Sequence, residues 1–428
     1  MDHSGSSTPS ITPEQIEKLK QFVLEQAAPR LREQTPGSSD ETRIVTQLVK
    51  EICEKARIGL PAAAVADIVQ SVISQLSGFG LIQPLLDDPT VSEIMVNGAQ
   101  NVYVEENGIL HKTDLAFQSD AQVLDLIKKI ITPLNRRINA DQPMVDGRLP
   151  DGSRVNAVIP PVAIDGPSIT IRKFQRGKLG VEKLIELGTL SQHMADFLKV
   201  CVLAKFNIIV SGGTGTGKTT LLNALSSFIP EKERIITIED AAELVMQQEH
   251  VVRMETKPGN PDGSGLVIIR DLVRNSLRMR PDRIVIGEVR GGEAMDMLQA
   301  MNTGHDGSLT TLHANTPRDA ISRLETMCLM SGVEIPLKVV RQQIASAIDL
   351  IIQVSREKDG SRKITAITEV VGMEGETVVL TDIFKFERKG VAADGKVLGQ
   401  LKPTGIRPQF SARLEALGYR LGAEIFGG

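Results

Sequence analysis

Apolar residues recur every three or four positions through the first part of the chain, which is the spacing of helices that bury one face. Three such stretches precede residue 78, at Ile16–Val23, Ile44–Ile52 and Ala62–Leu76. We expect Pro29 and the polar stretch 35–40 to end the first helix, because proline lacks the N–H that a helix interior needs. The pattern predicts a small helical bundle over 13–78, preceded by a Ser- and Pro-rich tail, 1–12, that we expect to be disordered.

Between residues 79 and 174, short apolar runs alternate with turn residues, and one longer stretch has helical spacing. Short runs separated by Asn, Asp and Gly are typical of strands and hairpins. The predicted strands are 92–96, 102–105, 155–159 and 168–173, and the predicted helix is 121–134. This mixture predicts an α+β domain over 79–174. The polar stretch 175–180, which contains glycine, is predicted to be a hinge-like linker.

From residue 181 onward, strongly apolar runs alternate with helical patterns. The runs 208–210, 235–239 and 284–288 are almost entirely apolar, as expected for parallel strands that are covered on both faces. Strands that alternate with helices predict an α/β domain with a parallel sheet. Later in the chain the pattern predicts three further strands and a last helix, at 364–371, 377–380, 383–386 and 411–417. We assign all of 181–428 to this domain.

The composition is that of an ordinary globular protein and offers little for nucleic-acid binding. The chain has 428 residues, a net charge of −4, and 3% aromatic residues with no tryptophan. A slightly acidic chain lacks the positive field that attracts phosphate backbones, and few aromatic side chains are available to stack on bases. We therefore expect no nucleic-acid partner.

Cysteine spacing and hydropathy argue against several further classes of protein. Cys53, Cys201 and Cys328 form no C-x-x-C pair, so neither a zinc site nor a disulfide framework is predicted, and we expect buried, reduced thiols. Residues 1–12 lack the apolar core of a signal peptide. Residues 68–86 carry no charge, but their helical spacing and their polar residues indicate an amphipathic helix rather than a membrane span.

One glycine-rich segment matches the phosphate-binding loop pattern G-x-x-x-x-G-K-[ST] without a mismatch. The apolar run 206–210 precedes it and the helical pattern 220–225 follows it. In such loops the backbone N–H groups face the phosphates, the lysine reaches the β- and γ-phosphates, and the hydroxyl ligates Mg²⁺. We assign Lys218 and Thr219 to the last two roles; a glycine-rich turn without a ligand is the alternative. The predicted nucleotide-binding residues are Gly212, Gly213, Thr214, Gly215, Thr216, Gly217, Lys218, Thr219 and Thr220.

Hydrolysis also needs carboxylates near the metal and the attacking water. Two apolar runs end in acids: Glu239 and Asp240 close one, and Glu288 closes the other. We expect the strand that ends at Glu239 to lie beside the strand that enters the phosphate loop, at the carboxyl edge where ligands bind in open α/β sheets. Glu243 follows in the same acidic segment. Solvated acids at strand ends are the alternative for both groups.

Histidines and arginines supply the remaining candidates. His305 and His313 flank a Gly- and Thr-rich segment, where an imidazole can donate to a phosphate oxygen, so a γ-phosphate sensor is favoured over an ordinary core residue. Arg148, Arg154 and Arg172 are also candidates, because the planar guanidinium donates two parallel hydrogen bonds to phosphate. From the residues alone, however, surface salt bridging is the favoured role of these arginines.

Four motifs, taken in order, resemble those of the type II/IV secretion ATPase superfamily. They are the phosphate loop, 237–243, 277–294 and 311–315, which correspond to its Walker A motif, Asp box, atypical Walker B motif and His box. The resemblance covers about 79–355. The chain lacks the four-cysteine zinc insertion typical of type II secretion and pilus-extension ATPases. The stretches 80–98, 145–156 and 404–408 are most similar to the CpaF-type motors of tight-adherence (Tad) pili, and relatives in conjugative secretion and archaeal motility are alternatives.

The resemblance implies a hexameric motor that hydrolyses ATP with Mg²⁺. It implies a RecA-like domain joined by the linker to the α+β domain, with nucleotide bound between them, in a cytoplasmic ring attached to the inner membrane through its partners. Those partners would be platform proteins of a pilus or secretion system. The alternatives are a type IV secretion traffic ATPase of another branch and a RecA-like DNA translocase. A signalling GTPase has no support, because no N-K-x-D base-reading motif is present.

The resemblance also implies a role for each candidate residue. Lys218 and Thr219 would hold phosphate and Mg²⁺, and Glu288 would support the metal and the water. Glu239 is the predicted general base, with Glu243 as the second candidate, and His313 would sense phosphate. The arginines at 148, 154 and 172 resemble the N-terminal-domain arginines that approach the γ-phosphate, and this role replaces the salt bridging favoured above.

Overall fold

The computed structural model describes residues 13–31, 39–56, 58–76, 78–134, 136–174, 179–259, 264–392 and 395–427. The chain forms two compact units, 1–175 (unit 1) and 176–428 (unit 2), and each is described by itself. The expected disordered tail, 1–12, and most of the expected linker, 175–180, lie outside the described residues. Among the helices that are described, none has the length and apolar character needed to cross a bilayer.

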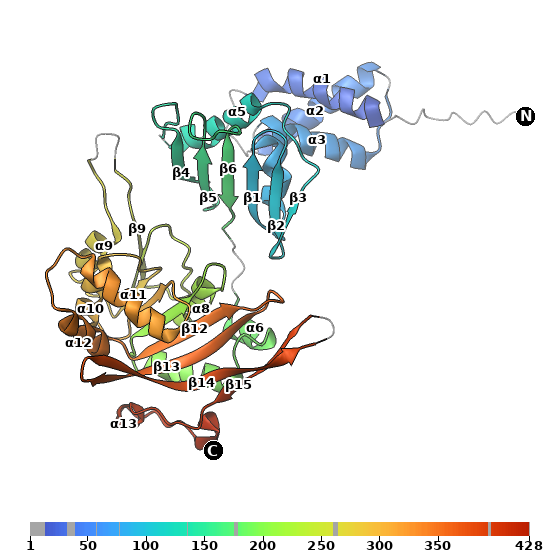
Figure 1. Cartoon of the computed structure of the whole chain (residues 1–428). Coiled ribbons are helices and arrows are strands. Elements are labelled where there is room, and N and C mark those ends of the chain that lie inside the picture. The colour runs from blue at the N-terminus through green and yellow to red at the C-terminus, as the bar shows by residue number, and fades with distance from the viewer. Residues whose placement is uncertain are drawn as a thin grey trace, which may run out of the picture. The chain divides into compact units, whose positions relative to one another are not determined.

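Unit 1 begins with three helices that pack on one another: α1 (Pro13–Leu31), α2 (Ser39–Ala56) and α3 (Ala62–Leu76) (Figure 1). Their apolar faces meet in a core of their own that contains Val23, Val49 and Ile68. The expectation that Pro29 ends the first helix is wrong, since α1 continues to Leu31. A proline in the last turn removes only one backbone hydrogen bond, and the helix extends just two residues beyond it.

An antiparallel sheet forms the rest of unit 1. Within the described ranges it has six strands in the order β3-β2-β1-β6-β5-β4. The strands are β1 (Val91–Asn97), β2 (Val102–Glu106), β3 (Ile109–Lys112), β4 (Met144–Arg148), β5 (Arg154–Val158) and β6 (Ser168–Arg172). The helical elements are η1 (Gly80–Ile82), α4 (Gln83–Asp87), α5 (Asp120–Ile131) and η2 (Thr132–Leu134). The apolar face of α5, with Val123 and Ile127, is buried in the same core as the strands.

Two strands of this sheet, β3 and β4, are missing from the sequence prediction. All four residues of β3 are exposed, so the strand carries no inward-facing apolar signal. β4 contains Asp146-Gly147, a pair that is usual in turns. Both strands form because their backbones pair with a neighbouring strand, β3 with β2 and β4 with β5.

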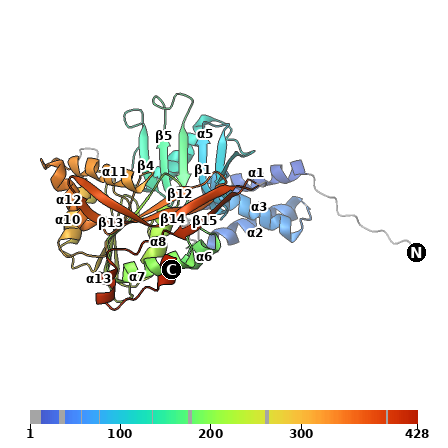
Figure 2. The ribbon, with the colours of Figure 1, turned by 60° about the horizontal axis from the view of Figure 1, so that its bottom comes forward.

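Unit 2 contains a mixed sheet that, among the described residues, has nine strands in the order β15-β14-β13-β12-β7-β11-β10-β8-β9. The strands are β7 (Ile208–Gly212), β8 (Ile235–Glu239), β9 (Val251–Glu255), β10 (Arg283–Ile286), β11 (Leu309–Leu312), β12 (Leu350–Arg356), β13 (Arg362–Glu374), β14 (Thr377–Val391) and β15 (Val397–Pro403). The strands from β12 to β9 are parallel, and β13, β14 and β15 extend the sheet with antiparallel pairs. Figure 2 shows β12, β13 and β14 side by side.

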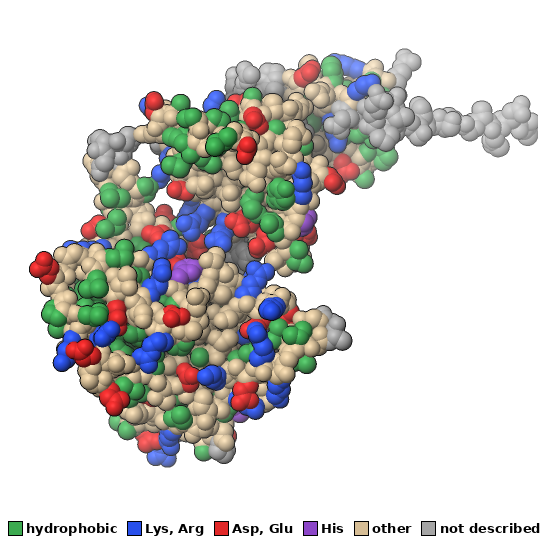
Figure 3. Space-filling model, viewed as in Figure 1, with side chains coloured by type: hydrophobic (Ala, Val, Ile, Leu, Met, Phe, Trp, Pro, Cys, Tyr) green, Lys and Arg blue, Asp and Glu red, His purple; other side chains and the backbone are tan. Residues whose placement is uncertain are grey.

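Helices cover both faces of the parallel strands, as the apolar runs predict. One core joins the sheet to α7 (Gln192–Leu203) and α8 (Lys218–Ser226), and the other joins it to α10 (Glu293–Asn302), α11 (Pro317–Leu329) and α12 (Leu337–Ala347). The remaining helices are α6 (Val181–Glu186), α9 (Ile269–Ser276), α13 (Ser411–Ala416) and η3 (Ala423–Phe426). On the face of unit 2 seen in Figure 3, acidic and basic side chains are intermixed.

The strand order corrects one prediction. The strand that ends at Glu239, β8, does not lie beside β7, because β10 and β11 come between them. Neighbours along the chain are not always neighbours in a sheet, since a helical crossover can pass over several strands. Three strand spacings of about 4.8 Å put the axes of β8 and β7 roughly 14 Å apart.

The C-terminal strands are also longer than predicted. The expected runs 377–380 and 383–386 form one strand, β14, and β13 extends to Glu374. Register shifts in the pairing of β13 with β14 interrupt the alternation of apolar and polar residues. The sequence pattern therefore suggests two short strands where the backbone forms one continuous strand.

The cysteines are as predicted: Cys53, Cys201 and Cys328 are all buried and free of disulfides. Burial raises the pKa of each thiol, to about 12 for Cys328.

Candidate functional site

The glycine-rich segment forms a tight loop between a buried strand and a helix. β7 is buried along its whole length and ends at Gly212, and α8 begins at Lys218. A side chain at Gly212 would place its Cβ 2.5 Å from the carbonyl oxygen of Val354, so the adjacent β12 leaves room only for glycine. Gly215 and Gly217 have φ angles of 70° and 92°, a region that glycine enters without strain.

The backbone of this loop is suited to an anion. In the part of the chain that the structure describes, the N–H groups of Gly215, Thr216 and Gly217 donate to no protein acceptor. The Thr216 hydroxyl donates to the carbonyl oxygen of Gly213 over 2.9 Å and so closes the turn. Consecutive N–H groups without acceptors, beside the N-terminus of α8, form a cradle for phosphate oxygens.

Lys218 lies across this cradle. Its Nζ donates to the Gly213 carbonyl oxygen over 2.8 Å and lies 3.4 Å from Nε2 of His313. The residue is buried, and burial lowers its pKa; a nearby carboxylate, Glu288, acts in the opposite direction. Among the described residues no carboxylate lies within salt-bridge distance of this ammonium group, which can therefore pair with an anion that enters the loop.

The ends of three adjacent strands, β7, β11 and β10, bring the phosphate loop, His313 and Glu288 together. β11 pairs with β7 and β10 pairs with β11, so the residues after these strands follow one another along the carboxyl edge. Nε2 of His313 lies 2.8 Å from Oε1 of Glu288, and the other oxygen of Glu288 accepts from Arg290 over 2.6 Å. Burial, and secondly the charge of Lys218, lower the pKa of His313, which favours the neutral imidazole near pH 7.

Two carboxylate oxygens at this edge have no donor. Oε1 of Glu288 is close to His313 but outside hydrogen-bond geometry, and it and Oε1 of Glu239 are buried atoms without a hydrogen-bond partner among the described residues. Hard cations take oxygen ligands, and Mg²⁺ is usually held by one or two side chains together with substrate phosphates and water. The buried oxygen of Glu288 fits that mode, and Thr219, the other ligand predicted from the sequence, is the second residue of α8. No group of three or more His, Cys, Asp or Glu residues that could hold a metal occurs in the described ranges.

Glu239 occupies the end of β8, one strand beyond Glu288. Its Oε2 accepts from the backbone N–H groups of Glu243 and Leu244 over 2.7 and 2.9 Å. The side chain packs under the end of β10, where a Cβ at Gly287 would lie 2.9 Å from its Cγ. Burial raises the pKa of Glu239 to about 7, against the effect of the two N–H donors. Its second oxygen, Oε1, accepts no hydrogen bond from the described residues.

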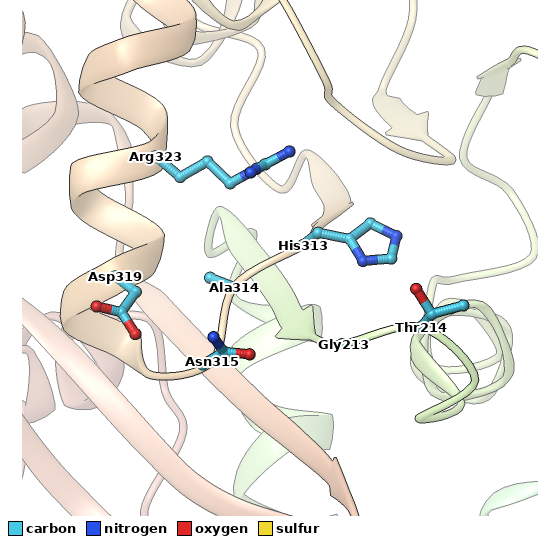
Figure 4. A pocket seen from close by; sticks show the side chains of 7 residues that line it. All are labelled: Gly213, Thr214, His313, Ala314, Asn315, Asp319 and Arg323. Carbon is cyan, nitrogen blue, oxygen red and sulfur yellow. The ribbon is translucent and has the colours of Figure 1, made fainter.

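A cavity of about 370 Å³ opens beside the loop on the His313 side. It is lined by Gly213, Thr214, His313, Ala314, Asn315, Asp319 and Arg323 (Figure 4). Asp319 and Arg323 project from α11, whose first turn is capped by Thr316. Neither Asp319 nor Arg323 is among the candidates predicted from the sequence. The cap at Thr316 and the four-residue spacing predict that Asp319 and Arg323 lie on one face of a helix. The sequence does not predict that this face lies beside the phosphate loop.

The three candidate arginines lie in unit 1, on neighbouring strands. In the sheet register Arg148 of β4 is opposite Arg154 of β5, and Arg154 is opposite Arg172 of β6. Residues directly opposite one another share a face of the sheet, so the three side chains form one row. The structure thus gathers the sequence candidates into two groups, this row in unit 1 and the loop, His313, Glu288 and Glu239 in unit 2.

The fold and the loop define an α/β protein with a phosphate-binding loop at the carboxyl edge of a parallel sheet. The chain matches the family model described as "Type II/IV secretion system protein" over residues 75–380, and it belongs to that family. This confirms the superfamily that the motifs predicted. It also agrees with the predicted fold class, a RecA-like α/β domain preceded by an α+β domain and a helical bundle.

Individual relatives carry names from conjugation and type IV secretion. A putative conjugal transfer protein of Mycobacterium tuberculosis is 34% identical over 77% of this chain and 94% of its own length. The conjugal transfer protein TrbB of Rhizobium radiobacter is 33% identical over 68% of this chain and 86% of its own. Among solved structures, the VirB11 ATPase of the Brucella suis type IV secretion system is 29% identical, with a TM-score of 0.38 and coverage of 67% of this chain and 92% of that one.

Proposed function

We propose that the protein is a motor ATPase of a type IV secretion-type machine. In this proposal it binds ATP with Mg²⁺ at the phosphate loop, hydrolyses it in a hexameric ring, and transmits the resulting movement to inner-membrane platform proteins. The observation that carries the proposal is the sequence of close contacts from Lys218 through His313 to Glu288, placed at the ends of three adjacent parallel strands. Conjugal transfer proteins among the relatives support this branch.

Each residue of the site has a separate role in this proposal. The loop N–H groups bind the β-phosphate, and Lys218 turns from the Gly213 carbonyl oxygen toward the β- and γ-phosphates. The neutral imidazole of His313 contacts the γ-phosphate, and its contact with Glu288 makes the position of Glu288 depend on whether that phosphate is present. Thr219 and Glu288 would hold Mg²⁺, and the ion would supply neutralisation of charge on the phosphates. Glu239 is the proposed general base, with Glu243 as the second candidate.

Release of inorganic phosphate tests the proposal. Purified protein with ATP and Mg²⁺ should release phosphate, and chelation of the metal should stop the release. Native mass spectrometry should show six copies when nucleotide is present. A protein that releases no phosphate, even as a complete ring with an inner-membrane partner added, would contradict the proposal. Stimulation of turnover by DNA would instead support the translocase alternative.

A Tad pilus motor is the second candidate. It is favoured by the similarity of 80–98, 145–156 and 404–408 to CpaF-type motors. The two candidates share the chemistry and differ in the partner, so deletion of the gene separates them. Loss of surface pili with conjugation intact supports the pilus motor, and the reverse result supports the conjugal branch.

We expect the rate of hydrolysis to rise as the pH increases through about 7, if Glu239 accepts the proton. A general base acts when it is deprotonated, and the fraction of deprotonated Glu239 increases as the pH passes its pKa. Glu239→Gln should lower the rate by roughly 100-fold or more and remove this pH dependence. The measurement is steady-state turnover between pH 6 and pH 9.

The stability of the same variant provides the control. Because the pKa of Glu239 is raised on folding, the native state is stabilised by the proton and loses this stability as the pH rises from about 4.5 to 7. The neutral Glu239→Gln variant should therefore melt at least as high as the natural protein at pH 8. An unchanged pH–rate profile in this variant would leave Glu243 or Glu288 as the base.

Arg154→Ala is expected to leave nucleotide binding unchanged and to lower turnover by roughly 100-fold or more, since an arginine that stabilises transition-state charge contributes about 10³–10⁵ in rate. Arg137→Ala, which removes an exposed arginine from the same unit, is the matched control. The comparison needs titration of nucleotide binding and single-turnover hydrolysis. An unchanged rate in Arg154→Ala would restore the salt-bridge role.

A further inference from the structure

The turn between β12 and β13 lies against the phosphate loop, on the side of β7 away from His313. β12 and β11 flank β7, so residues at the end of β12 meet the loop from the opposite direction. Nε of Arg362, the first residue of β13, donates to the carbonyl oxygen of Gly215 over 3.1 Å. Its Cδ would lie 3.2 Å from a Cβ at Gly217. One arginine side chain therefore donates a hydrogen bond to one positive-φ glycine of the loop and lies beside the other.

The hydrogen bond from Arg362 fixes the direction of one peptide group. In a planar trans peptide the carbonyl oxygen and the following N–H point in opposite directions. A Gly215 carbonyl held toward β13 therefore turns the Thr216 N–H away from β13. That N–H belongs to the group without acceptors in the described part of the chain. Glycine has the widest conformational freedom of any residue, so a contact from outside the loop restricts the orientations that this peptide group can take before a ligand arrives.

The turn that carries Arg362 is firmly fixed. Glu357 is buried and pairs with Arg388 of β14, and its N–H donates to the carbonyl oxygen of Ser361 over 2.7 Å. A carboxylate oxygen of Asp359 accepts from the backbone N–H of Val397, in β15, over 2.7 Å. The turn is thus attached to β14 and to the edge strand β15. Because the backbone of this turn is fixed, the Cα of Arg362 has a fixed position relative to the sheet, which a mobile loop would not provide.

The stability of the hairpin does not account for the arginine. Arg362 is directly opposite Arg356 in the register of β12 and β13, and like charges in directly opposite positions destabilise a strand pair. The guanidinium of Arg356 also comes within 3.9 Å of the Cβ position of Gly215. Positive charge is therefore concentrated beside a loop whose expected ligand is an anion.

We propose that Arg362 is a positioning residue of the nucleotide site: it holds the Gly215 carbonyl so that the Thr216 N–H faces the phosphate before the nucleotide binds. This inference rests on the proposed function. It differs from the catalytic roles above because Arg362 acts through the loop and contributes equally to the bound substrate and to the transition state. Its loss should therefore weaken binding without slowing the chemical step.

The test is to compare Arg362→Ala with the natural protein in steady-state ATP hydrolysis and in calorimetric titration with ADP. We expect the KM for ATP and the Kd for ADP to increase roughly tenfold, the effect of one hydrogen bond from a charged group. kcat should stay within about twofold. Arg362→Lys should recover most of the affinity, because one carbonyl acceptor needs only one donor. Lys358→Ala, which removes an exposed cation from the same turn, is the matched control and should change neither constant.

The outcomes separate this inference from the proposed function. Natural protein that hydrolyses ATP, with Arg362→Ala showing the same KM, overturns the inference alone. A variant that loses kcat at unchanged KM also overturns it, since that result assigns Arg362 to the transition state. A lowered melting temperature that Arg362→Lys does not restore would reduce Arg362 to a folding role. If the natural protein neither binds nor hydrolyses nucleotide, the proposed function fails first and the inference fails with it.

Discussion

Replacement of Lys218 by alanine is expected to abolish ATP hydrolysis and to lower nucleotide affinity by at least about 100-fold. Lys218 carries the only ammonium group on the loop itself. Its Nζ donates a hydrogen bond to a loop carbonyl oxygen and lies close to His313. Hydrogen bonds to charged groups contribute roughly 1.5–3 kcal/mol each, and contacts to two phosphates would exceed the factor of 100. Loss of the same charge from the transition state then removes turnover.

Titration with ADP and ATP, together with a phosphate-release assay, measures both effects. Lys199→Ala is the matched control. Lys199 is exposed on α7, and its substitution removes the same charge from the surface of unit 2. The two variants should melt at similar temperatures. Hydrolysis by Lys218→Ala at the natural rate would mean that the phosphate loop is not the reaction site, and the mechanism proposed above would have to be abandoned.

Glu288→Ala should have the second largest effect, a loss of turnover of roughly 10²–10⁴-fold with nucleotide binding within about threefold of the natural value. The reason is geometric. Oε1 of Glu288 is buried, close to His313 and without a hydrogen bond among the described residues, so it is placed to act on a group that arrives with the nucleotide. The loop N–H groups and Lys218 supply most of the binding and remain intact in the variant.

Two companion variants make the result specific. Glu288→Gln keeps the shape of the side chain and removes its charge, so it should be as inactive as alanine if the carboxylate itself is required. Glu334→Gln removes an exposed carboxylate from unit 2 and should have no effect on turnover. Binding by equilibrium titration and turnover under saturating nucleotide are the two measurements. Normal turnover in Glu288→Ala would exclude this residue from the reaction.

The phosphate loop and the central strands could be predicted because their signals are local. The loop matches a strict spacing of glycines with Lys218, and its flanking strand begins with three consecutive apolar residues, 208–210. β3, in contrast, has no buried residue, and the pairing of β13 with β14 contains register shifts, so neither shows the regular alternation that identifies a strand. These strands are determined by their partners rather than by their own residues.

The neighbours of the site could be predicted only in part, because they depend on the order of the strands. We predicted that β8 lies beside the loop strand, whereas β10 and β11 lie between them. As a result His313 lies next to Lys218, and Glu288 lies next to His313. Arg362 contacts Gly215 across 147 positions of sequence, through the pairing of β7 with β12. Contacts of this kind have no local signature in a single sequence.

The three buried cysteines give the chain a practical advantage for spectroscopy. Their thiols are covered and hold their protons at neutral pH, which makes them poor targets for maleimide and related reagents. A cysteine placed at an exposed position in each of the two units could therefore be tagged with a dye pair while the natural thiols stay unlabelled. The distance between the dyes during a catalytic cycle could then be followed in the otherwise unmodified polypeptide.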